Sequence, residues 1–216
     1  MLLQPNAKLL MTGDSITDAG RKAVREGNPD ALGQGYVQMV SALIGATQPK
    51  TPVRMVNTGI SGNTARDLSK RWQTDVLDHA PDWLSIMIGT NDVWRQFDYP
   101  LQTELHVLPE EYTTLLSNLI EQARPKVRGL VLMTPFFIEP NKADPMRARM
   151  DQYGSIVKTI AEKYDAIFVD TQAAFDLATQ STHPFTLARD RVHPTPTGHM
   201  ILALAFLRAV GFTLTT

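Results

Sequence analysis

The sequence predicts an α/β fold over residues 1–216: a single domain built as a three-layer α/β/α sandwich with a central five-stranded parallel sheet. Two observations carry this prediction. Five short apolar segments are spaced along the chain, and segments with apolar residues at helical spacing lie between them. Such an alternation implies right-handed crossover connections, and these produce a parallel sheet with helices on both faces.

The expected strands are short, mainly apolar runs, as in interior strands that are buried on both faces. In chain order they are residues 8–11, 53–57, 83–88, 129–134 and 166–169. The expected helices repeat apolar residues three and four positions apart. In chain order they are residues 35–44, 64–77, 109–123, 147–164 and 195–210. The third helix begins with Pro-Glu-Glu, a favourable first turn, and the last begins with Thr-Pro-Thr and continues apolar.

The composition excludes several classes of protein. Lysine and arginine number 21 against 22 acidic residues, so no strong field favours nucleic acid or an anionic membrane surface. Cysteine is absent, which excludes disulfides and a thiol nucleophile. The N-terminal residues lack the pattern of a secretory signal, and the longest apolar run, residues 200–207, is too short to cross a bilayer. We therefore expect a cytoplasmic protein with no nucleic-acid or membrane partner, either a monomer or a homo-oligomer.

A serine stands just beyond the first predicted strand. The strand ends in a tight Gly13-Asp14 turn, and Ser15 follows it. Ligands of open α/β sheets bind at the carboxyl ends of the strands, so Ser15 lies where chemistry is expected. A serine hydroxyl becomes a useful nucleophile only when a nearby base takes its proton. His193 can be that base, and Asp190, three residues earlier, can orient it. Taken alone, Asp190 could equally cap the helix that begins near Thr195.

Four short blocks together resemble the motif blocks of the SGNH hydrolases, also called the GDSL family. In chain order they are Gly13-Asp14-Ser15-Ile16-Thr17, Asn57-Thr58-Gly59-Ile60-Ser61-Gly62-Asn63-Thr64, Gly89-Thr90-Asn91-Asp92 and Asp190-Arg191-Val192-His193-Pro194. A single Gly-Asp-Ser says little, but four blocks in the family's order are specific. The resemblance implies a flavodoxin-like sheet. It also implies ester hydrolysis through an acyl-enzyme intermediate.

The resemblance also implies roles for individual residues. Ser15, Asp190 and His193 correspond to the catalytic triad. The oxyanion hole would consist of the backbone N–H groups of Ser15 and Gly62 and the side-chain amide of Asn91. From the residues alone, Gly62 could simply belong to a turn and Asn91 could cap a helix. No two histidines have the spacing of a metal site, so no metal and no cofactor are expected.

The substrate is predicted from the segments that follow the third and fourth strands. Trp94, Arg95, Phe136 and Glu139 occur there, and aromatic side chains mixed with polar ones suit a sugar, although Phe136 could instead be a core residue. Within the family the blocks look most like those of bacterial acetylxylan esterases, which implies an acetylated xylo-oligosaccharide as substrate. The alternatives are a lipid-type esterase, such as a lysophospholipase or thioesterase, and a non-catalytic binding module.

Overall fold

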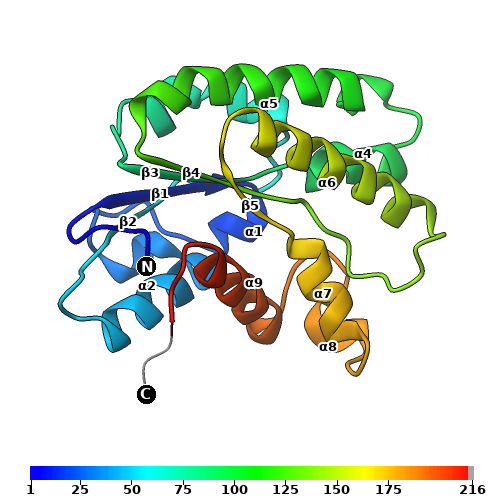
Figure 1. The fold of residues 1–216 in the computed structure, drawn as a ribbon. Coiled ribbons are helices and arrows are strands. Elements are labelled where there is room, and N and C mark those ends of the chain that lie inside the picture. The colour runs from blue at the N-terminus through cyan, green and yellow to red at the C-terminus, as the bar shows by residue number, and fades with distance from the viewer. Residues whose placement is uncertain (214–216) are drawn as a thin grey trace.

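The computed structural model describes residues 1–213; the last three residues of the predicted domain lie outside this range. Its centre is a sheet of five strands that pair in parallel in the order β2-β1-β3-β4-β5 (Figure 1). The strands are β1 Lys8–Gly13, β2 Arg54–Asn57, β3 Trp83–Met87, β4 Gly129–Met133 and β5 Ile167–Val169. The predicted α/β fold is thereby confirmed, and the strand order is the flavodoxin-like one.

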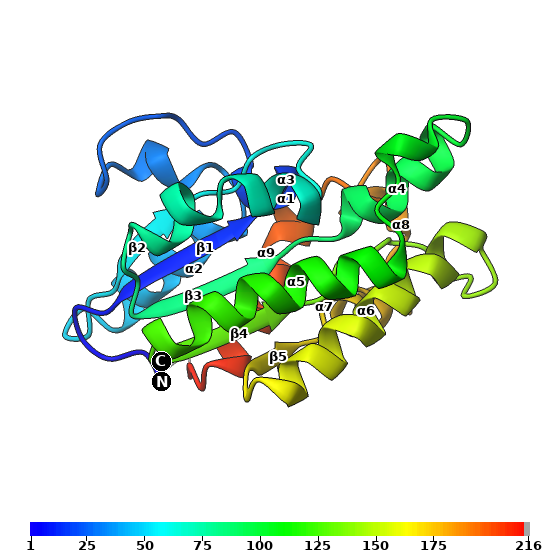
Figure 2. The same cartoon turned by 90° about the horizontal axis from the view of Figure 1, so that it is seen from above.

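The two faces of the sheet are covered by different helices (Figures 1 and 2). One layer contains α3 Ala65–Lys70, α4 Thr90–Asp98, α5 Pro109–Ala123 and α6 Pro145–Lys163. The opposite layer contains α1 Ser15–Asp18, α2 Tyr36–Thr47, α7 Thr171–Thr179, α8 Pro184–Leu187 and α9 Pro196–Ala209. Short 3-10 turns at Pro29–Leu32, Thr103–Leu105 and Arg124–Lys126 connect these elements.

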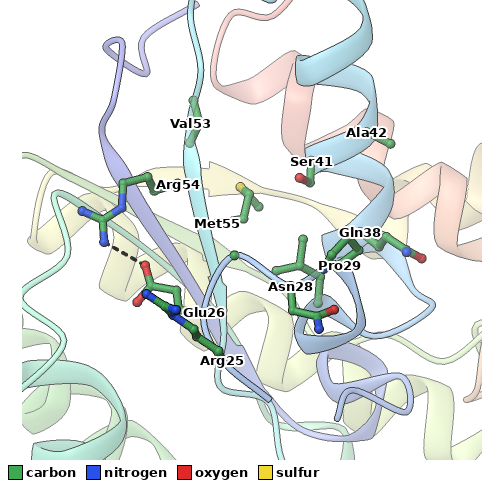
Figure 3. A pocket seen from close by; sticks show the side chains of 12 residues that line it. Arg25, Glu26, Asn28, Pro29, Gln38, Ser41, Ala42, Val53, Arg54 and Met55 are labelled. Atoms are coloured by element: carbon green, nitrogen blue, oxygen red, sulfur yellow. Dashed lines mark hydrogen bonds and ion pairs between the residues drawn. The ribbon is translucent and has the colours of Figure 1, made fainter. Parts of the chain in front are cut away.

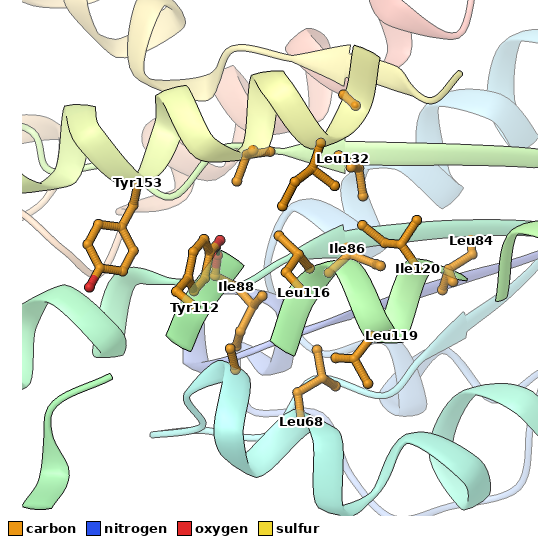
Figure 4. Packing of buried hydrophobic residues seen from close by; sticks show 14 of the residues in the cluster. Leu68, Leu84, Ile86, Ile88, Tyr112, Leu116, Leu119, Ile120, Leu132 and Tyr153 are labelled. Atoms are coloured by element: carbon orange, nitrogen blue, oxygen red, sulfur yellow. Dashed lines mark hydrogen bonds between the residues drawn. The ribbon is translucent and has the colours of Figure 1, made fainter. Parts of the chain in front are cut away.

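Each face of the sheet supports its own hydrophobic cluster, because neighbouring residues of a strand point to opposite faces. In β1, Leu10 belongs to the cluster under α3, α5 and α6, whereas Leu9 and Met11 belong to the cluster under α2 and α9. Figure 4 shows the first cluster, in which Leu116 of α5 packs with buried side chains of β3 and β4. Burial of both faces explains why the strand sequences are apolar runs without alternation.

The sheet has its switch point at the carboxyl end of β1. Here β1 lies between β2 and β3, with Met11 opposite Asn57 and Gly13 opposite Met87. The chain leaves the sheet in opposite directions on the two sides of β1, so the connecting loops separate and leave room for a ligand. The segments that follow β1, β2 and β3 carry the first three motif blocks, and this register brings them together.

The helices differ from the prediction in several places. The helix expected over residues 64–77 is two elements, because α3 ends at Lys70 and a separate π-helical turn spans Gln73–Leu77. Helix α4 is absent from the predicted helices, since most of its residues are polar and Val93 alone supplies a buried aliphatic side chain. Helices α1, α7 and α8 are also absent from the prediction. Helix α5 has the predicted bounds, and no helix in the described part of the chain is long and apolar enough to span a membrane.

Candidate active site

The turn after β1 is built by residues that permit only this local geometry. A Cβ atom at Gly13 would lie 2.2 Å from the carbonyl oxygen of Met87, so only glycine fits between the strands. The carboxylate of Asp14 accepts a hydrogen bond of 3.0 Å from the N–H of Ile16 and caps α1. Ser15 is therefore placed as the first residue of α1, at the switch point of the sheet, with its side chain partly exposed.

Three side chains predicted for the triad lie within hydrogen-bonding distance of one another. The Oγ atom of Ser15 is 3.0 Å from Nε2 of His193, although the two residues are 178 positions apart in the sequence. On the other side of the ring, Nδ1 of His193 is 2.6 Å from Oδ2 of Asp190. A hydroxyl, an imidazole and a carboxylate in this succession can transfer a proton from oxygen to nitrogen and stabilise the resulting imidazolium.

Asp190 is held in an ionised state by its surroundings. Partial burial opposes its charge. However, Asp190 Oδ2 lies 2.6 Å from the His193 ring, and Oδ1 accepts bonds from the backbone N–H groups of Val192 (3.0 Å) and His193 (2.8 Å). These hydrogen bonds outweigh burial and lower the pKa of Asp190. The same contacts fix the loop, so the carboxylate and the imidazole keep one relative orientation.

The predicted oxyanion donors lie on the segments after β1, β2 and β3. Gly62 has φ of +82°, a conformation that favours glycine. The Asn91 side chain donates a bond of 3.0 Å to the carbonyl oxygen of Asn63, while its own oxygen accepts a bond of 3.1 Å from Arg95. Two partners thus fix the plane of the amide. Among the hydrogen bonds of residues 1–213, the second N–H of this amide has no acceptor, so it can serve a substrate.

Arg71 joins the segments that follow β1 and β2, and sequence reasoning missed it. Its guanidinium donates to the carbonyl oxygens of Gly13 (3.0 Å) and Thr58 (2.7 Å) and to the side-chain oxygen of Asn63 (2.7 Å). Asp75 pairs with it at 3.1 Å. Because the partners are scattered along the chain and two of them are carbonyl oxygens, no local pattern could have pointed to this arginine.

The four residues predicted to bind substrate have different surroundings. Trp94 and Arg95 lie on α4, and the centroid of the Trp94 ring is 5.7 Å from that of the His193 ring. The prediction that Phe136 lines the pocket was wrong. Its side chain has no exposed surface, and its ring centroid lies 4.5 Å from that of Phe175, because the chain after β4 turns this side chain into the core. Glu139 is occupied by an ion pair with Arg191 and a bond from the N–H of Asn141. Glu139 therefore stabilises the loop that precedes His193.

A cavity of about 700 Å³ lies away from this site, beside the edge strand β2 (Figure 3). Residues 25–32, α2 and β2 line it, and an ion pair of 2.9 Å between Arg54 and Glu26 crosses one side. None of the predicted site residues belongs to this cavity. Among residues 1–213, no group of three or more histidine, aspartate or glutamate side chains is arranged to hold a metal ion.

Two fully buried carboxyl groups lie beneath the site. Burial raises the pKa of Asp14 to about 6 and that of Asp92 to about 7, despite hydrogen bonds that favour the charged forms. Asp92 accepts a bond of 2.9 Å from the N–H of Ala65, and it thereby anchors the start of α3 to α4. Its second oxygen has no hydrogen-bond partner within residues 1–213. A neutral carboxyl group suits this environment better than a charged one.

Replacing Asp92 with asparagine should flatten the dependence of stability on pH. Between the unfolded pKa near 3.8 and the folded pKa of about 7, the unfolded chain loses a proton that the folded protein keeps. The free energy of unfolding therefore falls as pH rises, by up to about 1.4 kcal/mol per unit. Urea denaturation at pH 5 and pH 7 should show that the free energy of unfolding of the wild type falls between these pH values by roughly 2–3 kcal/mol more than that of Asp92→Asn. Parallel profiles for the two proteins would show that Asp92 is already ionised at pH 5.

The sheet of this α/β/α sandwich presents serine, histidine and aspartate side chains in hydrogen-bonding succession at its switch point. This arrangement defines a class of protein, the hydrolases that use a serine nucleophile. Within that class, the chain belongs to the GDSL-like lipase/acylhydrolase family, whose model matches residues 11–201. This confirms the resemblance of the four blocks, and the chain is a carboxylic ester hydrolase.

Several relatives of this chain are known. An acetylxylan esterase of Geobacillus stearothermophilus is 54% identical over 213 residues, which are 98% of this chain and 97% of that protein. The crystal structure of Axe2, an acetylxylan esterase from the same organism, matches with a TM-score of 0.98 at 53% identity and covers 100% of this chain and 99% of that chain. LAE5, an α/β hydrolase enzyme from the metagenome of Lake Arreo in Spain, matches with a TM-score of 0.97 at 50% identity, over 100% of both chains. Other Axe2 structures are catalytic mutants in which a serine, a histidine or an aspartate is replaced by alanine.

Proposed function

We propose that this enzyme releases acetate from O-acetylated xylo-oligosaccharides through an acyl-enzyme intermediate on Ser15. The observation that carries the chemistry is the succession of contacts from Ser15 Oγ through the His193 ring to the Asp190 carboxylate. The substrate class is transferred from the acetylxylan esterases to which the chain is similar along nearly its whole length. The proposal includes that residues 1–216 form a single catalytic domain.

The reaction follows from the positions of these groups. His193 takes the hydroxyl proton as Ser15 Oγ attacks the acetyl carbonyl carbon. The N–H groups of Ser15 and Gly62 and the amide of Asn91 then donate to the developing oxyanion. His193 returns the proton to the sugar oxygen as the C–O bond breaks, leaving acetyl on Ser15. A water molecule activated by His193 hydrolyses that ester, and the proton passes back to Ser15. Asp190 stays ionised throughout and stabilises the imidazolium.

A comparison of substrates tests this function against the lipid-type alternative. Acetyl, butyryl and octanoyl esters of one alcohol should show kcat/KM greatest for acetyl and at least about tenfold lower for butyryl. Each methylene that finds no apolar surface forfeits about 0.8 kcal/mol and adds steric strain. Acetate release from acetylated xylo-oligosaccharides, followed by chromatography, should be faster than from a simple acetyl ester.

Other outcomes would point elsewhere. An octanoyl optimum would favour the lipid-type esterase. A pure, folded protein that hydrolyses none of these esters would favour the binding module.

A further inference from the structure

A groove of about 550 Å³ begins beside the candidate oxyanion hole and is lined by none of the three triad residues. Gly62 marks its inner end, α3 forms one wall through Lys70, and Arg95, Tyr99, Gln102 and Leu105 form the other. We propose that this groove binds the sugar that leaves from the ester, as a subsite for a neutral carbohydrate. The proposal rests on the function proposed above and names the surface that recognises the alcohol part of the substrate.

The groove is connected to the leaving-group side of the reaction. The departing sugar oxygen takes its proton from Nε2 of His193, so the sugar must start next to that ring. The Trp94 ring lies 5.7 Å from the His193 ring. The Arg95 guanidinium lies 5.4 Å from the Trp94 ring and 5.5 Å from the Tyr99 ring. Trp94, Arg95 and Tyr99 therefore form a continuous surface from His193 into the groove.

The charges around the groove favour a neutral ligand. Each cation that lines it already has an acidic partner: Arg66 pairs with Glu111 at 2.8 Å, Lys70 pairs with Asp67 at 3.0 Å, and Arg95 pairs with Asp98. No net positive field therefore remains to select a phosphate or a carboxylate. The paired groups still present many donors and acceptors, which suit a molecule covered with hydroxyl groups.

The apolar part of the groove is too small for a long acyl chain and suitable for a sugar ring. Tyr99 and Leu105 are the large apolar side chains among the lining residues, and they are 45% and 38% exposed. Two contacts hold Tyr99 in place at the end of α4. Its ring packs against the Arg95 guanidinium, and its carbonyl oxygen lies 3.0 Å from Nε2 of the His106 ring. An aromatic ring fixed in advance can pack against the C–H face of a pyranose at low entropic cost.

The test compares how the enzyme treats a large and a small leaving group. The two substrates are acetylated xylo-oligosaccharides and ethyl acetate, whose two-carbon alcohol is too small to fill a groove of about 550 Å³. In Tyr99→Ala the ratio of their kcat/KM values should fall about tenfold, since the sugar loses both apolar burial and aromatic contact. Gln102→Ala, an exposed position whose loss leaves the core intact, should lower the same ratio about threefold. Tyr164→Ala, at the end of α6 and outside the site, is the matched control and should leave the ratio unchanged.

The alternative outcomes separate the two proposals. An unchanged ratio in Tyr99→Ala would remove the groove from sugar recognition. If the ratio is unchanged because both substrates lose activity equally, Tyr99 only supports the structure. A loss confined to octanoyl esters would assign the groove to the acyl chain. If the wild type ignores acetylated xylo-oligosaccharides, the proposed function fails. The groove proposal is then decided by the same variants on acetylated cello-oligosaccharides, where an unchanged ratio or no activity overturns it.

Discussion

Replacing Ser15 with alanine should lower kcat for acetyl esters by roughly four to six orders of magnitude and leave a folded protein. The substitution removes the Oγ atom of Ser15, which lies 3.0 Å from Nε2 of His193, and the backbone N–H that would serve the oxyanion remains. Alanine is also compatible with the first position of α1, so Tm should change little. Initial rates on an acetyl ester and a thermal unfolding curve together measure the effect.

A matched control and a second readout sharpen this test. Ser155→Ala removes an exposed hydroxyl of α6 that, within residues 1–213, donates to the Asp151 carbonyl oxygen alone, and it should retain full activity. A serine-directed covalent inhibitor should add its mass to the peptide that contains Ser15 in the wild type and not in Ser15→Ala. Near-normal turnover by pure Ser15→Ala, or labelling of another serine, would refute the assignment of the nucleophile.

Replacing Asp190 with asparagine should lower kcat by about 10⁴-fold at every pH. An asparagine can still accept from the backbone N–H groups of Val192 and His193, so the loop keeps its conformation. If its amide nitrogen faces Nδ1 of His193, the ring must carry its proton on Nε2, the atom that should accept from Ser15. The negative charge that stabilises the imidazolium is also lost. Asp170→Asn, which keeps the cap of α7 far from the site, is the control and should have wild-type kcat.

The pH profile of the wild type follows from the same contacts. The pKa of Asp190 is lowered, so its carboxylate stays charged from neutral into mildly acidic solution. His193 must be neutral to accept the proton of Ser15, and activity should therefore rise from acidic to neutral pH. Asp190→Asn should stay low across the range, with no recovery at high pH. An activity maximum near pH 4 in the wild type would instead indicate a protonated carboxyl group as the acid, and the triad assignment would be wrong.

The sequence by itself determined the class of fold and the family. The five apolar runs became the five strands, because burial on both faces of a parallel sheet demands continuous apolar residues. The four blocks follow strands or precede α9, and their conformations are local. Gly62 is required by a positive φ, and Asp14 is required by the cap of α1. Such requirements act over a few residues, so they leave a pattern that can be read directly.

Only the tertiary structure decided how these segments meet. The register of β1 between β2 and β3 places Ser15 near the loop of Gly62 and the helix of Asn91. The segment between α8 and α9 brings His193 to Ser15 from 178 residues away. Arg71 joins the segments after β1 and β2 through the carbonyl oxygens of Gly13 and Thr58, and every residue type carries such an oxygen. Phe136 is buried in the core and Tyr99 is exposed, although both are aromatic residues in the segments between β3 and β5. Side-chain direction and exposure depend on which elements pack together, and that choice is made by long-range contacts that no short window of sequence contains.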